Sequence, residues 1–488
     1  MTKSLIAMSV FMWGLVTLLN TYLTQGAYTA YDAGSYLLHL RILITDQPNI
    51  WADTLWSAYD RPPLSPGYLL VPFVGIFGAI SGIAAFQAAS NVLLMLATYL
   101  YIQRFIPVDK RIWGLLGAAI LCIAPFYTPH IWNGGTSSIG MAAVMLALWG
   151  IHKIGEGRYV HAWTFAPIAL ISLISMPVFV VSCVFLFVAA ILQSRRHWMF
   201  LAFVLFITYS TGIVMAWEWL IGASPVSTTY NDSMNITVVV LNFEGWRSPQ
   251  LAYLFATVYA GIMLSFTVKG YYVIRLASFS VLTVGIALIS STNEPLWNII
   301  LRVSQIGYHI IWASVIIVWA YGIPRRRLLI LGTTVLVLFA SLYAATHTVN
   351  NHVRIRHDDI IAISKLIPEG ETPIANISLE TYYAAVTGRP IVTPTLSTSG
   401  VPEAYKARFL DIICRAGWTT PEPCVSMDAY WIVVGGAAWN ELLIQKLDAF
   451  ADTFGVIAPD DVPSNFELVY EGSHSISLYR ERSTTNTE

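Results

Sequence analysis

Charged residues are scarce in this sequence. Only 11% of its 488 residues are Asp, Glu, Lys or Arg, and the formal net charge is -1. Soluble domains carry about 25% charged residues. A chain with 56% hydrophobic residues and a mean hydropathy of +0.62 therefore has most of its surface in hydrocarbon. The composition predicts an integral membrane protein, and the absence of a basic excess gives no sign of a nucleic-acid partner.

Cysteine is also scarce, and no CxxC pair or His/Cys cluster has the spacing of metal ligands. Cys122 and Cys183 lie inside apolar segments, where we expect inert core residues. Cys414 and Cys424 lie ten residues apart in a polar region. They are candidates for a disulfide if that region faces an oxidising compartment.

Long apolar runs are abundant, and segments of about 20 apolar residues are candidates for membrane spans. We expect about eleven spans, near residues 4–24, 82–105, 112–130, 135–153, 161–175, 177–193, 198–221, 250–268, 270–290, 299–321 and 328–347. The first run has no convincing cleavage site after it, so we interpret it as a retained helix rather than a signal peptide.

The positions of the positive charges indicate the membrane topology, because Lys and Arg are more frequent in cytoplasmic loops. All the basic clusters fall on one side only if 64–80 does not cross the membrane and 161–193 crosses twice, with a break at Pro177. This arrangement puts the N-terminus in the cytoplasm of a plasma (inner) membrane protein. It puts the first loop, 25–81, on the outer face together with 222–249 and 291–298.

The composition changes after residue 347. We therefore expect a transmembrane domain, 1–347, followed by an extracytoplasmic α/β domain, 348–488, because helical and strand patterns alternate there. The expected helices are 358–366, 379–387, 402–416 and 439–454, and the expected strands are 373–377, 390–392, 430–434, 466–471 and 475–479.

Two features of the first loop suggest chemistry. Asp32 is the first acid after the first span, at a membrane surface that tends to raise a carboxylate pKa. It is either a helix N-cap or a general base toward a substrate hydroxyl. Arg61 precedes Pro62 and Pro63; its guanidinium either binds a phosphate or belongs to an ordinary turn.

Taken together, these residues resemble the GT-C class of polyprenyl-phosphate-dependent glycosyltransferases, and in particular the protein O-mannosyltransferase and aminoarabinose transferase group. Asp32 in YDAGSY matches the acid of that group's first loop, RPPL at 61–64 matches its basic, proline-rich segment, and GIAAFQAASN at 82–91 matches the start of its second span. The resemblance covers nearly the whole chain as layout, but only residues 31–91 as motif.

The resemblance implies inverting transfer of a sugar from a polyprenyl-phosphate donor to a hydroxyl of a glycan, lipid or protein acceptor, with Asp32 as base. Its implied donor-phosphate ligands are Arg61, Arg247 and Arg302. We also expect substrate binding by outer-face polar residues: His39, His130, Asn133, Glu218, Glu244 and Glu294. Glu218 alternatively only ends its helix in water. We interpret His309, deeper in the same span as Arg302, as a hydrogen-bonded packing residue.

The sequence departs from the group in three places. One is the lysine-rich stretch that the aminoarabinose transferases have before a late span, which is replaced here by STNEPLW at 291–297. The loop after the third span contains His130 and Asn133 but no carboxylate, and the first loop has no Asp-x-Asp pair. A divalent metal therefore has little support, and we expect no cofactor. The missing acid leaves open an alternative: a non-catalytic membrane scaffold or ligand-binding protein of the same architecture.

Overall fold

The computed structural model has two compact units. The helical unit comprises residues 1–20, 84–220 and 237–348, and the mixed unit comprises 21–83, 221–236 and 349–488. The first-loop region thus belongs to the same compact unit as the C-terminal region. The structure describes residues 2–24, 27–28, 37–38, 40–41, 44–45, 65–123, 136–172, 176–194, 196–215, 309–314, 316–317, 355–371, 373–375, 379–389, 431–434, 462, 464–472 and 476–482.

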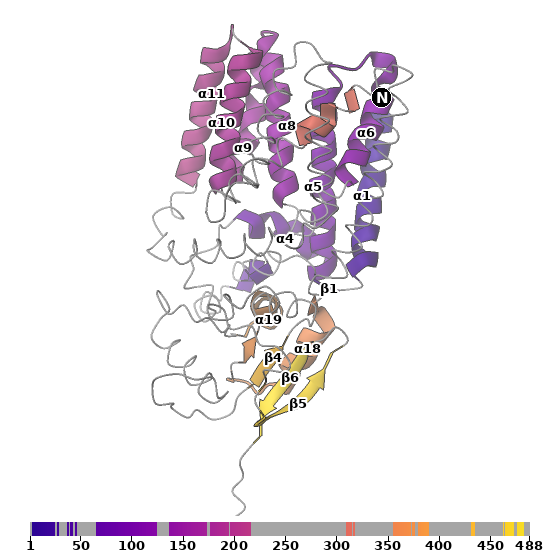
Figure 1. Cartoon of the computed structure of the whole chain (residues 1–488), viewed down its shortest axis with the longest axis vertical. Coiled ribbons are helices and arrows are strands. Elements are labelled where there is room, and N and C mark those ends of the chain that lie inside the picture. Colours follow the sequence, from indigo (N-terminus) through magenta and orange to yellow (C-terminus); the bar gives the residue numbers. More distant parts are fainter. Residues whose placement is uncertain are drawn as a thin grey trace, which may run out of the picture. The chain divides into compact units, whose positions relative to one another are not determined.

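Long apolar helices build the helical unit (Figure 1). Its labelled elements, two of which continue into the mixed unit, are α1 (Thr2–Thr24), α5 (Ala79–Ile102), η2 (Val108–Lys110), α6 (Arg111–Ile123), α8 (Thr136–Gly155), η3 (Tyr159–Phe165), α9 (Ala166–Ile171), α10 (Met176–Gln193) and α11 (Trp198–Met215). In the described part of the chain, three helices are long and apolar enough to cross a membrane: Ala79–Ile102, Ser138–Gly155 and Trp198–Met215. The predicted total of eleven spans extends beyond the described residues and stays a prediction.

The region 161–193 is divided as the sequence predicts. A 3-10 helix, η3, leads into the short helix α9, which ends at Ile171, and α10 begins at Met176, one residue before Pro177. Proline is tolerated in the first turn of a helix but breaks its interior. Helices α8, α9, α10 and α11 pack side by side (Figure 1). Gly212 of α11 allows the Phe179 ring of α10 to approach, since a Cβ there would lie 2.7 Å from Phe179 Cε2.

The segment after the proline-rich motif forms its own helix, α4 (Ser65–Phe77). Its 13 residues extend about 20 Å, which is less than the roughly 30 Å of a bilayer core. Gly78, with a φ of 78°, separates α4 from α5, because this backbone conformation favours glycine. Gly82 then lies close to the backbone of α4: a Cβ there would be 2.7 Å from Val74 Cα. A short helix that is separate from α5 agrees with the prediction that 64–80 does not cross the membrane.

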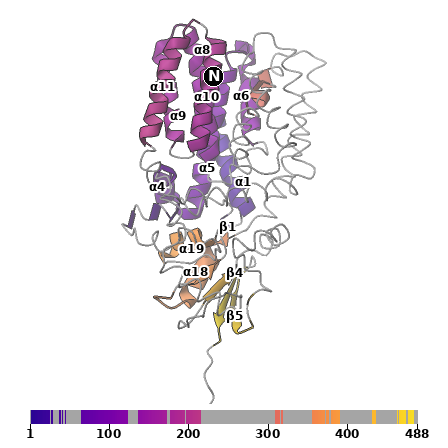
Figure 2. The same ribbon diagram turned by 60° about the vertical axis from the view of Figure 1, so that its left-hand side comes forward.

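The mixed unit contains a four-stranded sheet in the order β3-β4-β6-β5. Figure 2 labels two of its strands, β4 and β5. Its strands are β3 (Ile374–Ala375), β4 (Trp431–Val434), β5 (Phe466–Glu471) and β6 (Ser477–Glu481). β3 and β4 are parallel, whereas β6 is antiparallel to both neighbours. Gly472 N donates to Ile476 O at 2.7 Å in the β5–β6 hairpin.

Helices α18 (His357–Leu366) and α19 (Leu379–Thr387) pack together in this unit. They bury Ile360, Ile363, Tyr382 and Tyr383. Both helices and the hairpin are confirmed close to their predicted bounds, whereas predicted elements 390–392, 402–416 and 439–454 lie outside the described residues. A second, two-stranded sheet pairs β1 (Ala27–Tyr28) with β2 (Ile355–Arg356).

Candidate functional site

The predicted site residues lie outside the residues that the structure describes. This holds for the proposed base, the donor-phosphate and substrate-binding candidates, and the candidate disulfide: Asp32, His39, Arg61, His130, Asn133, Glu218, Glu244, Arg247, Glu294, Arg302, Cys414 and Cys424. Their roles therefore remain predictions. The structure does describe parts of the chain before and after Asp32 and after Arg61.

The chain before and after Asp32 contacts the C-terminal part of the mixed unit. Before it, Ala27 and Tyr28 pair with Arg356 and Ile355 in an antiparallel register. After it, Arg41 Nη1 donates to the carbonyl oxygens of Ala385 and Val386 at 3.2 and 3.1 Å. Burial lowers the pKa of the Arg41 guanidinium. This role of Arg41 could not be predicted from the sequence, since its partners lie more than 300 positions away along the chain.

A described helix, α4, begins shortly after Arg61 in the chain. Three residues separate Arg61 from Ser65, the first residue of α4, and Gly82 holds the start of α5 against α4. The prolines at 62 and 63 thus directly precede a helix, as the sequence predicts.

A row of buried polar residues runs along α5: Gln87, Ser90, Asn91 and Thr98. Ser138 Oγ, on α8, donates to Asn91 Oδ1 at 2.8 Å. Thr98 Oγ1 and His309 Nε2 form a hydrogen bond of 2.6 Å. The expectation that His309 is a hydrogen-bonded packing residue is confirmed, since its side chain is 1% exposed. These hydrogen bonds join α5 to α8 and to the helical residues 309–314, as is common between membrane helices.

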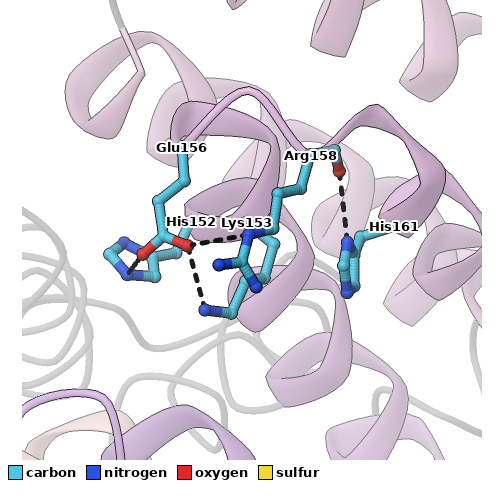
Figure 3. A network of polar contacts seen from close by, with 5 residues as sticks. All are labelled: His152, Lys153, Glu156, Arg158 and His161. Carbon is cyan, nitrogen blue, oxygen red and sulfur yellow. Dashed lines mark hydrogen bonds and ion pairs between the residues drawn. The ribbon is translucent and has the colours of Figure 1, made fainter.

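A charged network lies at the C-terminal end of α8 (Figure 3). Glu156 accepts from His152 Nε2 at 2.8 Å and from Lys153 Nζ at 3.0 Å, with Arg158 Nε at 3.8 Å. Partial burial opposes ionisation of Glu156, but the hydrogen bond from Lys153 and the nearby cations outweigh it and lower the Glu156 pKa. Gly157, with a φ of 84°, ends the helix. We interpret this network as a helix end rather than a reaction centre, because its groups satisfy one another.

Metal ligation has no support in the described part of the chain, where no three His, Cys, Asp or Glu side chains come together. The free cysteines there, Cys122 and Cys183, are buried in the helical unit as predicted.

The chain matches no known family profile and no curated protein sequence. It is similar to solved structures at low identity. One is the Archaeoglobus fulgidus oligosaccharyltransferase tethered to an acceptor peptide containing the NVT sequon, with 13% identity, a TM-score of 0.41, and coverage of 78% of this chain and 63% of that one. The same enzyme in complex with Zn and sulfate gives 14% identity, a TM-score of 0.46, and coverage of 96% and 72%.

A third similar structure is ArnT from Cupriavidus metallidurans bound to undecaprenyl phosphate. It shares 10% identity, covers 98% of both chains and has a TM-score of 0.36. The chain thus spans under two thirds of the length of the first of these structures. Residue roles therefore depend on the chain's own sequence.

Proposed function

We propose that this protein is a membrane glycosyltransferase that moves a sugar from a polyprenyl-phosphate carrier to an acceptor hydroxyl on the outer face of the plasma membrane. One observation carries the proposal. An apolar first helix, α1, is followed by the acid Asp32, then by Arg61 and two prolines, and then by the short helix α4, separate from α5. This order of elements is the layout expected for a GT-C enzyme.

In the proposed reaction, the Asp32 carboxylate accepts the proton of the acceptor hydroxyl as its oxygen attacks the anomeric carbon. The bond from that carbon to the phosphate oxygen breaks, and the configuration inverts. The lipid phosphate leaves with its charge, which a guanidinium stabilises best in a site with little water. Arg61, Arg247 and Arg302 are the proposed groups for this role.

The remaining polar candidates bind sugar or acceptor hydroxyls in this scheme. They are His39, His130, Asn133, Glu218, Glu244 and Glu294. The donor is a polyprenyl-phosphate sugar, and the acceptor is a glycan, lipid or protein. No step requires a cofactor.

A non-catalytic scaffold or ligand-binding protein is the alternative. It is favoured by one observation, the absence of a carboxylate from 127–136, the loop after the third predicted span. Such a protein would leave the donor pool unchanged.

The test compares native membranes that contain the protein with membranes from cells that lack it. Mass spectrometry follows the polyprenyl-phosphate sugars over time. The proposed enzyme predicts that one of these donors disappears only when the protein is present. Equal donor levels in the two membranes would favour the scaffold.

A further inference from the structure

The stretch of chain that carries Asp32 is bounded by two attachments to one part of the mixed unit. On its N-terminal side, β1 pairs with β2, with Ala27 opposite Arg356 and Tyr28 opposite Ile355. β2 continues without a break into α18. This attachment therefore connects the chain four and five residues before Asp32 to the start of a helix in the C-terminal region.

The second attachment follows Asp32. Leu37, Leu38 and Leu40 are buried, with 5%, 0% and 3% of their surface exposed. Arg41 Nη1 then donates to the carbonyls of Ala385 and Val386 at 3.2 and 3.1 Å. These residues are in the last turn of α19, where carbonyl groups have no partner within the helix and the helix dipole is negative. A guanidinium is well suited to this position, because it satisfies two such carbonyls at once.

Gly388 makes room for this contact. It follows α19 with a φ of +72°, and its N–H donates to Ala384 O at 2.9 Å. A Cβ at this position would lie 2.8 Å from Arg41 Cζ and closer still to Nη2. The glycine thus serves two purposes: it ends the helix and admits the guanidinium.

The receiving end of α19 is itself held in place. Arg389 Nη1 donates to the carbonyls of Ser364 and Ile367, both at 2.8 Å, at the C-terminal end of α18. Arg389 also contacts Pro368 O through Nη2. α18 and α19 therefore form one support, to which both β1 and Arg41 are attached.

We infer that Arg41 is a positioning residue for Asp32, and that the C-terminal region of the chain, through α18 and α19, holds the first loop for the transfer reaction. This inference rests on the proposed function. Arg41 does not contact the reacting atoms in this role. It acts by fixing the chain nine residues beyond the carboxylate, while β1 fixes the chain before it.

The test uses the full-length protein and three variants with a matched control. Arg41→Gln removes the charge-assisted contact, Arg41→Lys retains a charged donor, and Gly388→Ala places a methyl group against the guanidinium. Gly370→Ala is the control, because Gly370 also has a positive φ, +90°, but no atom lies within 4 Å of its added Cβ. Both glycine variants strain the backbone, but only Gly388→Ala displaces Arg41.

Two readouts are measured. Hydrogen exchange in nanodiscs follows peptides that cover 29–45, and mass spectrometry follows donor loss in native membranes between pH 5 and 9. We expect Arg41→Gln and Gly388→Ala to exchange about tenfold faster in 29–45 than Gly370→Ala. We also expect the rate of donor loss to fall by at least about tenfold in these two variants. The increase of that rate with pH should become shallower, because the proposed base, Asp32, is no longer positioned for the acceptor hydroxyl. Arg41→Lys should keep part of the slow exchange in 29–45 and part of the rate of donor loss.

Faster exchange with an unchanged rate and pH profile would overturn the inference and leave Arg41 as a purely structural contact. If Arg41→Gln and Gly388→Ala show the same hydrogen exchange and the same rate of donor loss as Gly370→Ala, Arg41 does not hold the first loop either. If wild-type membranes consume no donor, the proposed function fails and the positioning role fails with it, while hydrogen exchange still decides whether Arg41 holds the loop. If Arg41→Gln does not fold, Gly388→Ala and Arg41→Lys decide the question.

Discussion

At the scale of single residues, several polar side chains in the described part of the chain form hydrogen bonds with residues far away in the sequence. Thr98 and His309 are 211 positions apart, and Arg41 and Ala385 are 344 apart. Neither pairing could be predicted from a single sequence, because local periodicity identifies a face of a helix but not the element that packs on it. The sequence did indicate that His309 is a packing residue, since a lone histidine in an apolar run needs a partner.

The Thr98–His309 hydrogen bond should contribute measurably to stability. Replacing Thr98 by Val keeps the shape but removes the hydroxyl. We expect a loss of about 0.6 to 1.7 kcal/mol, the range for hydrogen bonds between membrane helices. Thermal unfolding in detergent measures it. Ser314→Ala is the control, because the Ser314 hydroxyl donates only within its own helix, to Ile310 O at 2.7 Å. Equal melting temperatures for both variants would argue against a stabilising contact.

A second hydrogen bond joins α18 to β5 in the mixed unit. Tyr470 Oη donates to Asp359 Oδ1 at 2.8 Å, and the Asp359 residue is 5% exposed. Burial and this hydrogen bond raise the pKa of Tyr470 to about 12. The raised pKa means that the stabilisation is fully present below the unfolded pKa of about 10 and is lost as pH rises through about 12.

Tyr470→Phe should therefore lower stability by about 1 to 3 kcal/mol, because it leaves a buried carboxylate without its donor. The loss should be constant between pH 6 and 9. Chemical unfolding at several pH values measures it, with Tyr479→Phe on β6 as the control. A loss that disappears within that range would contradict the assignment.

At the scale of elements, the sequence predicts best where local signals are complete. α19 was predicted at its observed bounds, and the 161–193 region divides near Pro177, because proline and helical periodicity act locally. The β2 strand was not predicted, since two residues carry no alternation pattern and form only by pairing with β1. The relation of α4 to α5 depends on Gly82, a contact that composition does not reveal.

The α4–α5 contact provides a test at this scale. Gly82→Ala places a Cβ 2.7 to 2.9 Å from the backbone of Phe73 and Val74, so the two helices must separate. We expect a loss of about 1 to 3 kcal/mol from overpacking. Gly75→Ala, also in a helix but with no atom within 4 Å of its Cβ, should be neutral or stabilising. Thermal unfolding of the two variants compares them directly, and equal stability would contradict the close approach.

At the scale of the whole molecule, the account depends on which side of the membrane each end of the chain occupies. The basic residues at the end of α8 predict a cytoplasmic location, and the proposed chemistry requires the C-terminal region on the outer face. The exposed side chains of Arg158 and Arg480 suit labelling, with 63% and 50% of their surface accessible.

The topology is tested by introducing one cysteine at a time at these two positions. Cys414 and Cys424 are replaced by Ser, and the buried Cys122 and Cys183 are kept. A membrane-impermeant maleimide should label Arg480→Cys in intact cells. It should label Arg158→Cys only after the membrane is permeabilised. The reverse pattern would put the proposed site on the wrong face.

The central claim is that the Asp32 carboxylate takes the acceptor proton during sugar transfer. The most direct measurement compares donor consumption in native membranes that contain equal amounts of folded wild-type protein or Asp32→Asn. General-base catalysis contributes a factor of about 100 to 10,000, so the variant should lose at least about 100-fold in rate while its melting temperature stays the same. Wild-type donor consumption by the folded Asp32→Asn variant would contradict the account.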